Sequence, residues 1–132
     1  MRKGNVMAEK ILLVDDDPVF IEATKAVLES KYRVITALDG EEGLEKARKQ
    51  KPDLILLDII MPAKDGFHVC GQLKRDPELA KIPVIMLTSF AQHGKDTNIP
   101  VSAGFELEAE GYIDKPISPE ALLKQVGSML KE

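Results

Sequence analysis

Several residues that can bind a metal ion or react with a phosphoryl group follow directly after short apolar runs of the sequence. In chain order they are Asp15, Asp16 and Asp17 after Ile11–Val14, Asp58 after Leu54–Leu57, Thr88 and Ser89 after Val84–Leu87, and Asp114 and Lys115 after Tyr112–Ile113. If these runs are strands of one open parallel sheet, their carboxyl ends form the edge beyond which ligands bind. The sequence therefore predicts that carboxylates, a hydroxyl group and an ammonium group meet at one edge. Asp53 precedes its run and falls at the opposite edge.

This combination of groups indicates phosphoryl chemistry supported by a divalent cation. Neighbouring carboxylates repel one another, and a hard divalent ion relieves that repulsion. Mg²⁺ takes oxygen ligands and suits sites that also hold a phosphoryl group, whereas zinc is disfavoured because the predicted edge offers neither His nor Cys. Lys115 supplies a point charge and Thr88 a hydroxyl donor for phosphoryl oxygens. Since a carboxylate can act as a nucleophile, the sequence predicts an Mg²⁺-dependent acyl-phosphate site.

The apolar runs indicate five strands of a parallel sheet. Ile11–Val14, Leu54–Leu57 and Val84–Leu87 are apolar without interruption, which is typical of strands buried on both faces. Tyr32–Ile35 and Tyr112–Ile113 complete the set. Because the strands alternate with helical segments, the pattern predicts an α/β fold in which right-handed crossovers place helices on both faces of the sheet.

Cap residues and apolar stripes define the helices between these runs. Asp17-Pro18 and Ser118-Pro119 each combine an N-cap residue with Pro at the first helical position. The expected inward-facing residues are Phe20, Ala23 and Val27 in the first helix, Leu44 and Ala47 in the segment from Asp39 to Lys49, Phe67, Cys70 and Leu73 in Gly66–Arg75, and Leu122, Val126, Met129 and Leu130 in the last helix. Ser89–Glu110 has no such stripe, so we expect a loop there and a fourth helix that is short or irregular.

Length and composition fit one soluble domain. The 132 residues are 44% hydrophobic and 30% charged, and 18 Lys and Arg against 22 Asp and Glu give a formal net charge of −4. This acidic balance argues against general nucleic-acid binding, which needs a basic surface. The single cysteine, Cys70, excludes an internal disulfide, and no apolar run approaches the roughly 20 residues of a membrane span. We expect a cytoplasmic protein with a flexible lead-in over residues 1–9 and one domain over residues 10–132.

Four segments, in this order, resemble the receiver domain of a bacterial two-component response regulator, with the fold of the chemotaxis regulator. They are ILLVDDDP (Ile11–Pro18), LLDIIMPAKDG (Leu56–Gly66), VIMLTS (Val84–Ser89) and GYIDKP (Gly111–Pro116). The resemblance extends from Lys10 to Leu130, which is nearly the whole chain. It implies a flavodoxin-like (βα)5 fold, doubly wound, with a five-stranded parallel sheet in the order 2-1-3-4-5 and helices on both faces.

The resemblance also implies a role for each acidic residue at the predicted edge. Asp58 matches the phospho-acceptor of the family. Asp15 and Asp16 match the acidic pair that binds Mg²⁺ (or Mn²⁺) together with Asp58 and the backbone carbonyl of Ile60. Asp17 is interpreted as a helix N-cap outside the metal site.

Other positions match groups that contact the phosphoryl group or respond to it. Thr88 matches the switch hydroxyl, Ser89 a small residue that leaves space for the phosphoryl group, and Lys115 the lysine that pairs with that group. Tyr112 matches an aromatic rotamer switch, and a half-buried strand aromatic is the alternative interpretation of this residue. The matches with a structural role near the site are Pro62, Gly66 and Pro116.

Two features depart from the usual family pattern. Thr88 and Lys115 are several residues further apart than is usual, and the extra length lies in Phe90–Glu110. Ile60 and Phe90 occupy positions that tune dephosphorylation in the family, and both are apolar here. Because an apolar side chain offers an attacking water no hydrogen-bond partner, we hypothesise that the phosphorylated form persists for many minutes or longer.

The resemblance implies a single-domain response regulator, which is a signalling switch and not an enzyme. A histidine kinase or phosphotransfer protein would phosphorylate Asp58, and the switched surface would then control a downstream target protein. The chain would act as a monomer or a phosphorylation-linked dimer, without binding nucleic acid or a membrane. We consider two alternatives: a small aspartyl-phosphate hydrolase with Asp15 as the nucleophile, and a pseudo-receiver that binds partners without phosphorylation.

Overall fold

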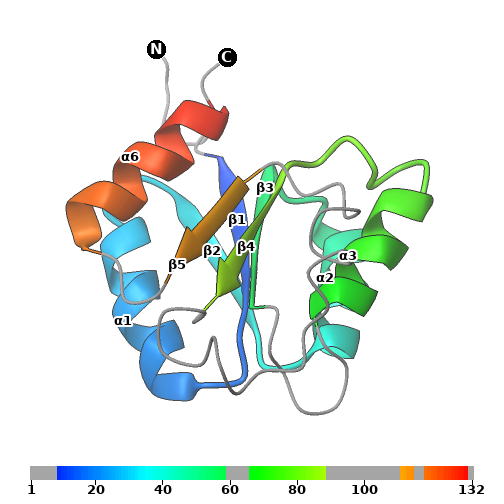
Figure 1. Ribbon diagram of the computed structural model, residues 1–132, viewed down its shortest axis with the longest axis horizontal. Helices are drawn as coiled ribbons and strands as arrows, with labels where there is room; N and C mark the ends of the chain where they lie inside the picture. Colours follow the sequence, from blue (N-terminus) through cyan, green and yellow to red (C-terminus); the bar gives the residue numbers. More distant parts are fainter. Residues whose placement is uncertain (1–8, 59–65, 89–110, 115–117, 131–132) are drawn as a thin grey trace.

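The structure is a computed structural model that describes residues 9–58, 66–88, 111–114 and 118–130. Five parallel strands form one sheet in the order β2-β1-β3-β4-β5 (Figure 1). The strands are β1 (Lys10–Val14), β2 (Arg33–Ala37), β3 (Leu54–Asp58), β4 (Val84–Thr88) and β5 (Gly111–Asp114). This arrangement confirms the predicted α/β class and the predicted strand order.

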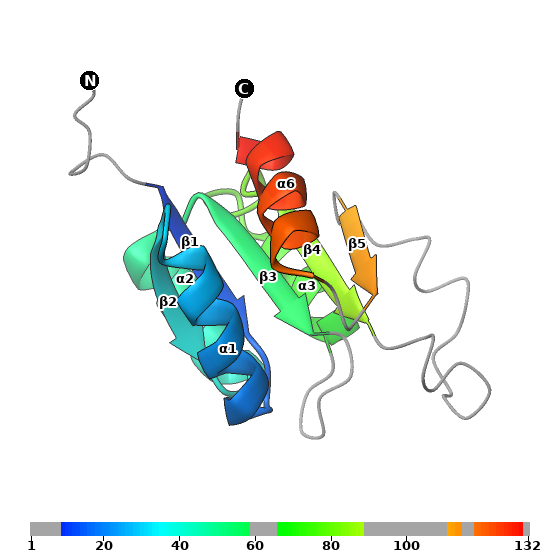
Figure 2. The same cartoon turned by 90° about the vertical axis from the view of Figure 1, so that its left-hand side faces the viewer.

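Helices cover both faces of the sheet, as predicted. They are α1 (Pro18–Leu28), α2 (Gly40–Gln50), α3 (Gly66–Arg75) and α6 (Pro119–Leu130). Figures 1 and 2 show α1 and α6 together on one face, with α2 and α3 on the other. None of the helices in these ranges is long and apolar enough to cross a membrane. The predicted lead-in, apart from Glu9, and the predicted irregular segment Ser89–Glu110 lie outside the described residues.

Side-chain caps fix where the helices begin. The Asp17 carboxylate accepts a hydrogen bond from the backbone N–H of Val19 at 3.0 Å, directly before Pro18 begins α1. Asp39 caps α2 by accepting from the N–H of Glu42 at 2.8 Å. The hydroxyl of Ser118 accepts from the N–H of Ala121 at 3.1 Å, next to the start of α6. These bonds satisfy N–H groups that the first helical turn leaves without partners, so the predicted starts are confirmed.

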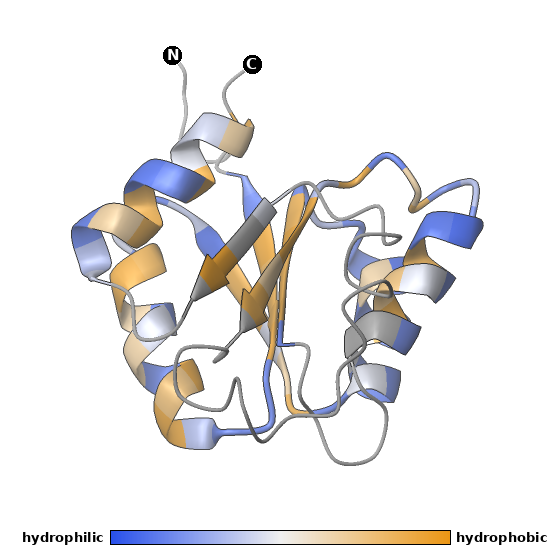
Figure 3. Cartoon of the chain, viewed as in Figure 1, coloured by the Kyte–Doolittle hydropathy of each residue, from blue (hydrophilic) through white to orange (hydrophobic). Residues whose placement is uncertain are grey.

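The sheet separates two hydrophobic cores, because successive residues of a strand face opposite sides. Leu12 and Val14 of β1 join the core under α2 and α3, whereas Ile11 and Leu13 join the core under α1 and α6. Figure 3 shows the strands as mostly hydrophobic between helices of mixed character. The predicted inward residues Leu44, Ala47, Cys70, Leu73, Leu122 and Val126 are all buried, while Met129 and Leu130 are partly buried against the core.

The predicted inward face of α1 was wrong by about one residue. The buried residues of α1 are Ile21, Thr24 and Leu28, and Ala23 is exposed. Phe20 and Val27 are only partly buried, at the margin of the core under α1 and α6. A stripe that starts at position 20 and one that starts at position 21 have the same spacing along the helix. The two stripes lie about 100° apart around the helix axis. The orientation found buries Ile21 and Leu28 and keeps Phe20 and Val27 partly buried, so that only the small Ala23 of the predicted stripe is left in water.

Candidate metal and phosphoryl site

Three carboxylates converge at the carboxyl ends of two neighbouring strands. Asp15 directly follows β1 and Asp58 is the last residue of β3, and these strands pair with Val14 opposite Leu57. The two aspartates therefore continue the same register at the edge of the sheet. One carboxylate oxygen from each of Asp15, Asp16 and Asp58 lies within 4.8 Å of the other two. The structure thus brings together the three acidic residues that the sequence placed in one site.

The burial of these groups adds to their ability to hold a cation. Asp15 is 0% exposed and Asp58 is 5% exposed, whereas Asp16 faces solvent. Carboxylates removed from water need hydrogen bonds or a counter-charge nearby. The three side chains offer only oxygen atoms, which suits a hard divalent ion such as Mg²⁺, and the exposed Asp16 leaves the group open to solvent on one side.

The position of Asp15 is fixed through its side chain and its backbone. Its Oδ1 accepts a hydrogen bond from the N–H of Asp17 at 2.9 Å. Its own N–H donates to the carbonyl of Ala37, the last residue of β2, at 3.1 Å. Asp17 uses its carboxylate for the α1 cap, so the interpretation of this residue as an N-cap is confirmed.

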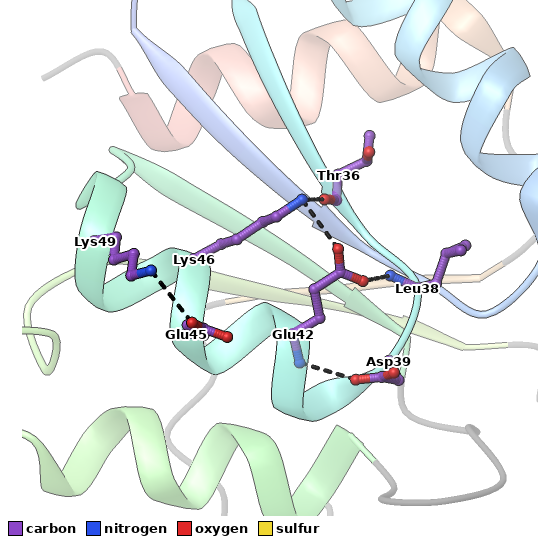
Figure 4. A network of polar contacts seen from close by, with 7 residues as sticks. All are labelled: Thr36, Leu38, Asp39, Glu42, Glu45, Lys46 and Lys49. Carbon is purple, nitrogen blue, oxygen red and sulfur yellow. Dashed lines mark hydrogen bonds and ion pairs between the residues drawn. The ribbon is translucent and has the colours of Figure 1, made fainter.

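The end of β2 and the turn that follows it are bound to α2 by two side chains whose role the sequence did not reveal. Glu42 Oε1 accepts from the N–H of Leu38 at 2.9 Å, and Lys46 Nζ donates to the carbonyl of Thr36 at 2.7 Å (Figure 4). Lys46 Nζ and Glu42 Oε2 also form an ion pair at 3.1 Å. We call Glu42 and Lys46, with these contacts, the α2 clasp. In the sequence, these contacts are indicated only by the spacing of four residues from Glu42 to Lys46, which predicts an ion pair on a helix.

The electrostatics of the clasp favour an ionised Glu42. The pKa of Glu42 is lowered, first because its carboxylate accepts the hydrogen bond from the backbone of Leu38, and second because it is bonded to Lys46. Both contacts stabilise the charged form of the carboxyl group. At neutral pH the clasp therefore joins a carboxylate and an ammonium group to two neighbouring parts of the chain.

The strand register brings two further predicted positions towards this edge. Asp58 pairs with Leu87 of β4, so Thr88 at the end of β4 is one strand away from the acidic group. Thr88 pairs with Asp114, the last residue of β5. Tyr112 lies on β5 opposite Met86, and Gly66 begins α3. These statements concern the backbone, because the side chains of Thr88 and Tyr112 are outside what the structure describes. The other predicted positions outside the described residues are Ile60, Pro62, Ser89, Phe90, Lys115 and Pro116.

Asp53 lies at the opposite edge of the sheet, before β3 begins. Its carboxylate accepts from the backbone N–H of Lys10 at 2.8 Å, and its own N–H donates to the carbonyl of Lys10 at 2.8 Å. Asp53 therefore joins the beginnings of two strands. This aspartate belongs to the same strand region as Asp58 but is separate from the candidate site.

A parallel sheet of this order, with carboxylates gathered beyond β1 and β3, defines a flavodoxin-like α/β protein with an acidic site at the carboxyl edge. Residues 11–127 match the family described as response regulator receiver domain. The chain belongs to this family, whose members are signalling switches in two-component systems.

Individual relatives agree with this assignment. The chain is 42% identical over 126 residues to the alkaline phosphatase synthesis transcriptional regulatory protein PhoP of Bacillus subtilis, a match that covers 95% of this chain and 50% of PhoP. It is 38% identical over 122 residues to the protein PilH of Pseudomonas aeruginosa, covering 92% of this chain and 97% of PilH. The chain thus spans about half of the first relative and almost all of the second.

A solved receiver domain has the same fold. The receiver domain of the sensor histidine kinase PA1611 of Pseudomonas aeruginosa superposes with a TM-score of 0.83 at 27% sequence identity. The match covers 95% of this chain and 99% of that one. The crystal structure of the PA1611 domain has a magnesium ion coordinated in its active-site cleft.

Proposed function

We propose that this chain is a receiver domain over residues 10–132 that accepts a phosphoryl group on Asp58 from the phosphohistidine of a histidine kinase or phosphotransfer protein. The observation that carries this proposal is the convergence of Asp15, Asp16 and Asp58 within 4.8 Å at the edge of the sheet. Asp58 is the group best suited to be the acceptor, because it ends the strand between β1, which leads to Asp15 and Asp16, and β4, which ends in Thr88.

Phosphorylation would proceed as a displacement at phosphorus. A carboxylate oxygen of Asp58 forms the new P–O bond while the P–N bond to the donor histidine breaks. The histidine nitrogen keeps the electron pair of that bond, and the product is an acyl phosphate on Asp58. Charge accumulates on the phosphoryl oxygens during transfer, so the site contributes mainly by positioning and by opposing that charge.

Asp15 and Asp16, together with Asp58 and the backbone carbonyl of Ile60, would hold Mg²⁺ (or Mn²⁺). The all-oxygen donor set supports this assignment, as does the magnesium ion in the receiver domain of PA1611. The bound ion would offset negative charge on the phosphoryl oxygens and on the carboxylates. The bond from the Asp17 N–H to Asp15 holds one of these carboxylates in place before the ion binds.

The response to phosphorylation would pass from the site to the surface near β4 and β5. Thr88, Ser89 and Lys115 would contact the phosphoryl group, and Tyr112 on β5 would change rotamer. Pro62, Gly66 and Pro116 would shape the segments around the site. The switched surface would then bind a downstream target protein. The chain would do so as a monomer or as a phosphorylation-linked dimer, and it would act as a switch and not as a turnover enzyme.

The proposal is tested by measuring the intact mass after incubation with acetyl phosphate and Mg²⁺. Wild type is compared with Asp58→Asn and with Asp53→Asn, a matched control in which the aspartate before β3, instead of the one at its end, loses its charge. We expect one added phosphoryl group in wild type and in Asp53→Asn, and none in Asp58→Asn.

The two alternative functions predict different results in the same experiment. A hydrolase with Asp15 as nucleophile would lose labelling in Asp15→Asn, keep it in Asp58→Asn, and release phosphate over many turnovers. A pseudo-receiver would show no adduct with acetyl phosphate or with a panel of phosphorylated histidine kinases. Either result would contradict the assignment of Asp58 as phospho-acceptor.

A further inference from the structure

We propose that the α2 clasp is a positioning device for the metal site, which it controls through the backbone of Asp15. This inference rests on the proposed function, because it assigns Glu42 and Lys46 a role in how the acidic group holds its cation. Neither residue belongs to the acidic group itself. They act from α2, on the side of β1 that faces α2 and α3.

The clasp holds the chain on both sides of Ala37, whose carbonyl accepts the backbone N–H of Asp15. Lys46 bonds the carbonyl of Thr36, and Glu42 bonds the N–H of Leu38. Ala37 lies between these two residues, and its carbonyl accepts the N–H of Asp15 at 3.1 Å. Figure 4 shows the two contacts reaching from the first turns of α2 to the end of β2 and the turn that follows it. A displacement of this turn would therefore be transmitted directly to the backbone of Asp15.

The surroundings leave Asp15 little freedom to compensate for such a displacement. Its side chain is 0% exposed, its Oδ1 is bonded to the N–H of Asp17, and the preceding Val14 is 1% exposed in the core. Closely packed interiors transmit small shifts to their neighbours. Removing the clasp is thus expected to change the geometry or the mobility of one metal ligand while the sheet and the core remain formed.

A second ion pair on the same helix separates this role from a general effect of surface charge. Glu45 and Lys49 have the same spacing and an N–O distance of 3.3 Å, but this pair joins two side chains of α2 to each other (Figure 4). Exposed pairs of this kind contribute little to stability. Glu45→Ala is therefore a matched control for Glu42→Ala, since it removes the same charge from the same helix.

The first measurement is made on the metal-free protein. Amide hydrogen exchange, followed by ¹⁵N-resolved NMR, reports how well the N–H of Asp15 is held by Ala37. We expect faster exchange of this amide in Glu42→Ala and Lys46→Met, and a wild-type rate in Glu45→Ala. Glu42→Gln should lie between wild type and Glu42→Ala, because the amide oxygen of Gln can still accept from the N–H of Leu38.

The second measurement is the Kd for Mg²⁺, obtained by isothermal titration calorimetry. Loss of groups that orient metal ligands commonly weakens metal affinity by about 10–100-fold. The clasp acts through one intervening hydrogen bond, so we expect a smaller effect, a rise in the Kd of about threefold to tenfold in Glu42→Ala and Lys46→Met. Labelling of Asp58 at saturating Mg²⁺ should still occur, and Glu45→Ala should bind Mg²⁺ like wild type.

The outcomes distinguish the clasp from the proposed function. Equal Kd values in Glu42→Ala, Lys46→Met and the control would overturn the positioning role, even if the Asp15 amide exchanged faster. A matching rise in Kd in Glu45→Ala would also overturn it, because the effect would then be one of net charge. Failure of wild type to bind Mg²⁺ would instead contradict the proposed metal site, and the exchange rates would still decide whether the clasp holds Asp15.

Discussion

Gly43 of α2 lies so close to Val14 of β1 that a side chain at position 43 has no space: a Cβ atom there would be 2.9 Å from Cγ2 of Val14. Val14 is 1% exposed and directly precedes Asp15. Its branched side chain has few alternative rotamers, so it cannot easily move aside. This contact sets how closely α2 approaches the end of β1 that carries the acidic group.

Gly43→Ala is expected to destabilise the protein. Ala would favour the helix by up to about 1 kcal/mol over Gly, but forcing an extra carbon into a packed site costs about 1–3 kcal/mol. The second effect is larger, and we expect a net loss of about 1 kcal/mol in the free energy of unfolding. Urea denaturation followed by circular dichroism measures the change.

Gly71→Ala is the control for this prediction. A Cβ atom at position 71 of α3 would lie 3.5 Å from the end of the flexible Arg75 side chain, which is an ordinary contact. Helix propensity should then dominate, and Gly71→Ala should leave stability unchanged or raise it by up to about 1 kcal/mol. If both variants gained stability, the contact between Gly43 and Val14 would not be tight.

Asp58→Asn is expected to change stability in opposite ways with and without Mg²⁺. Without the ion, removal of one of three neighbouring charges relieves repulsion, so the Tm should rise. Wild type should gain stability when Mg²⁺ is added, by about 2.7 kcal/mol at 100 times its Kd, whereas Asp58→Asn should lose most of this gain. Thermal unfolding with Mg²⁺ or with a chelator tests both parts, and Asp53→Asn should respond to Mg²⁺ like wild type.

Asp17→Ala is expected to lower the free energy of unfolding by about 1 kcal/mol, because the N–H of Val19 loses its cap. Asp17→Ser should lose much less, since a hydroxyl oxygen can replace the carboxylate as acceptor. Urea denaturation of the two variants provides the comparison. Equal losses would mean that the charge of Asp17, and not its hydrogen bond, supports α1.

The sequence was sufficient for the strands, the helix starts and the acidic group because these depend on patterns that are local in the chain, whereas the strand order was predicted from the resemblance of four motifs to the receiver family. Continuous apolar runs and cap residues locate the elements, and the carboxyl end of each strand locates Asp15 and Asp58. The face of α1 could not be settled this way, because stripes beginning at Phe20 and at Ile21 have the same spacing. Which stripe is buried depends on packing against the sheet.

The α2 clasp could not be found from spacing alone. Glu42 and Lys46 have the separation of an ordinary surface pair, and Glu45 and Lys49 have the same separation. The difference between the two pairs arises from the direction in which α2 leaves β2, which brings only the first pair within reach of the backbone there. That direction is a property of the folded chain.

The lowered pKa of Glu42 predicts a pH dependence that can be isolated by substitution. A carboxyl group whose pKa is lower in the folded state stabilises the fold above its unfolded value of about 4.5, and this stabilisation disappears as the pH falls through the folded pKa. The stability advantage of wild type over Glu42→Gln should therefore be complete at pH 7 and shrink below pH 4.5. Urea denaturation across this range measures it, and Glu45→Gln should show a smaller change.

The lifetime of the phosphorylated form tests the significance of Ile60 and Phe90. Neither side chain can hydrogen-bond a water molecule and direct it at the acyl phosphate on Asp58, so hydrolysis should be slow. We expect the adduct formed with acetyl phosphate to persist for many minutes after the donor is removed, as followed by intact mass. Phe90→Gln and Ile60→Asn should shorten this lifetime, because each replaces an apolar side chain with one that can hydrogen-bond a water molecule. A wild-type half-life of seconds, or variants with unchanged lifetimes, would show that these positions do not control hydrolysis.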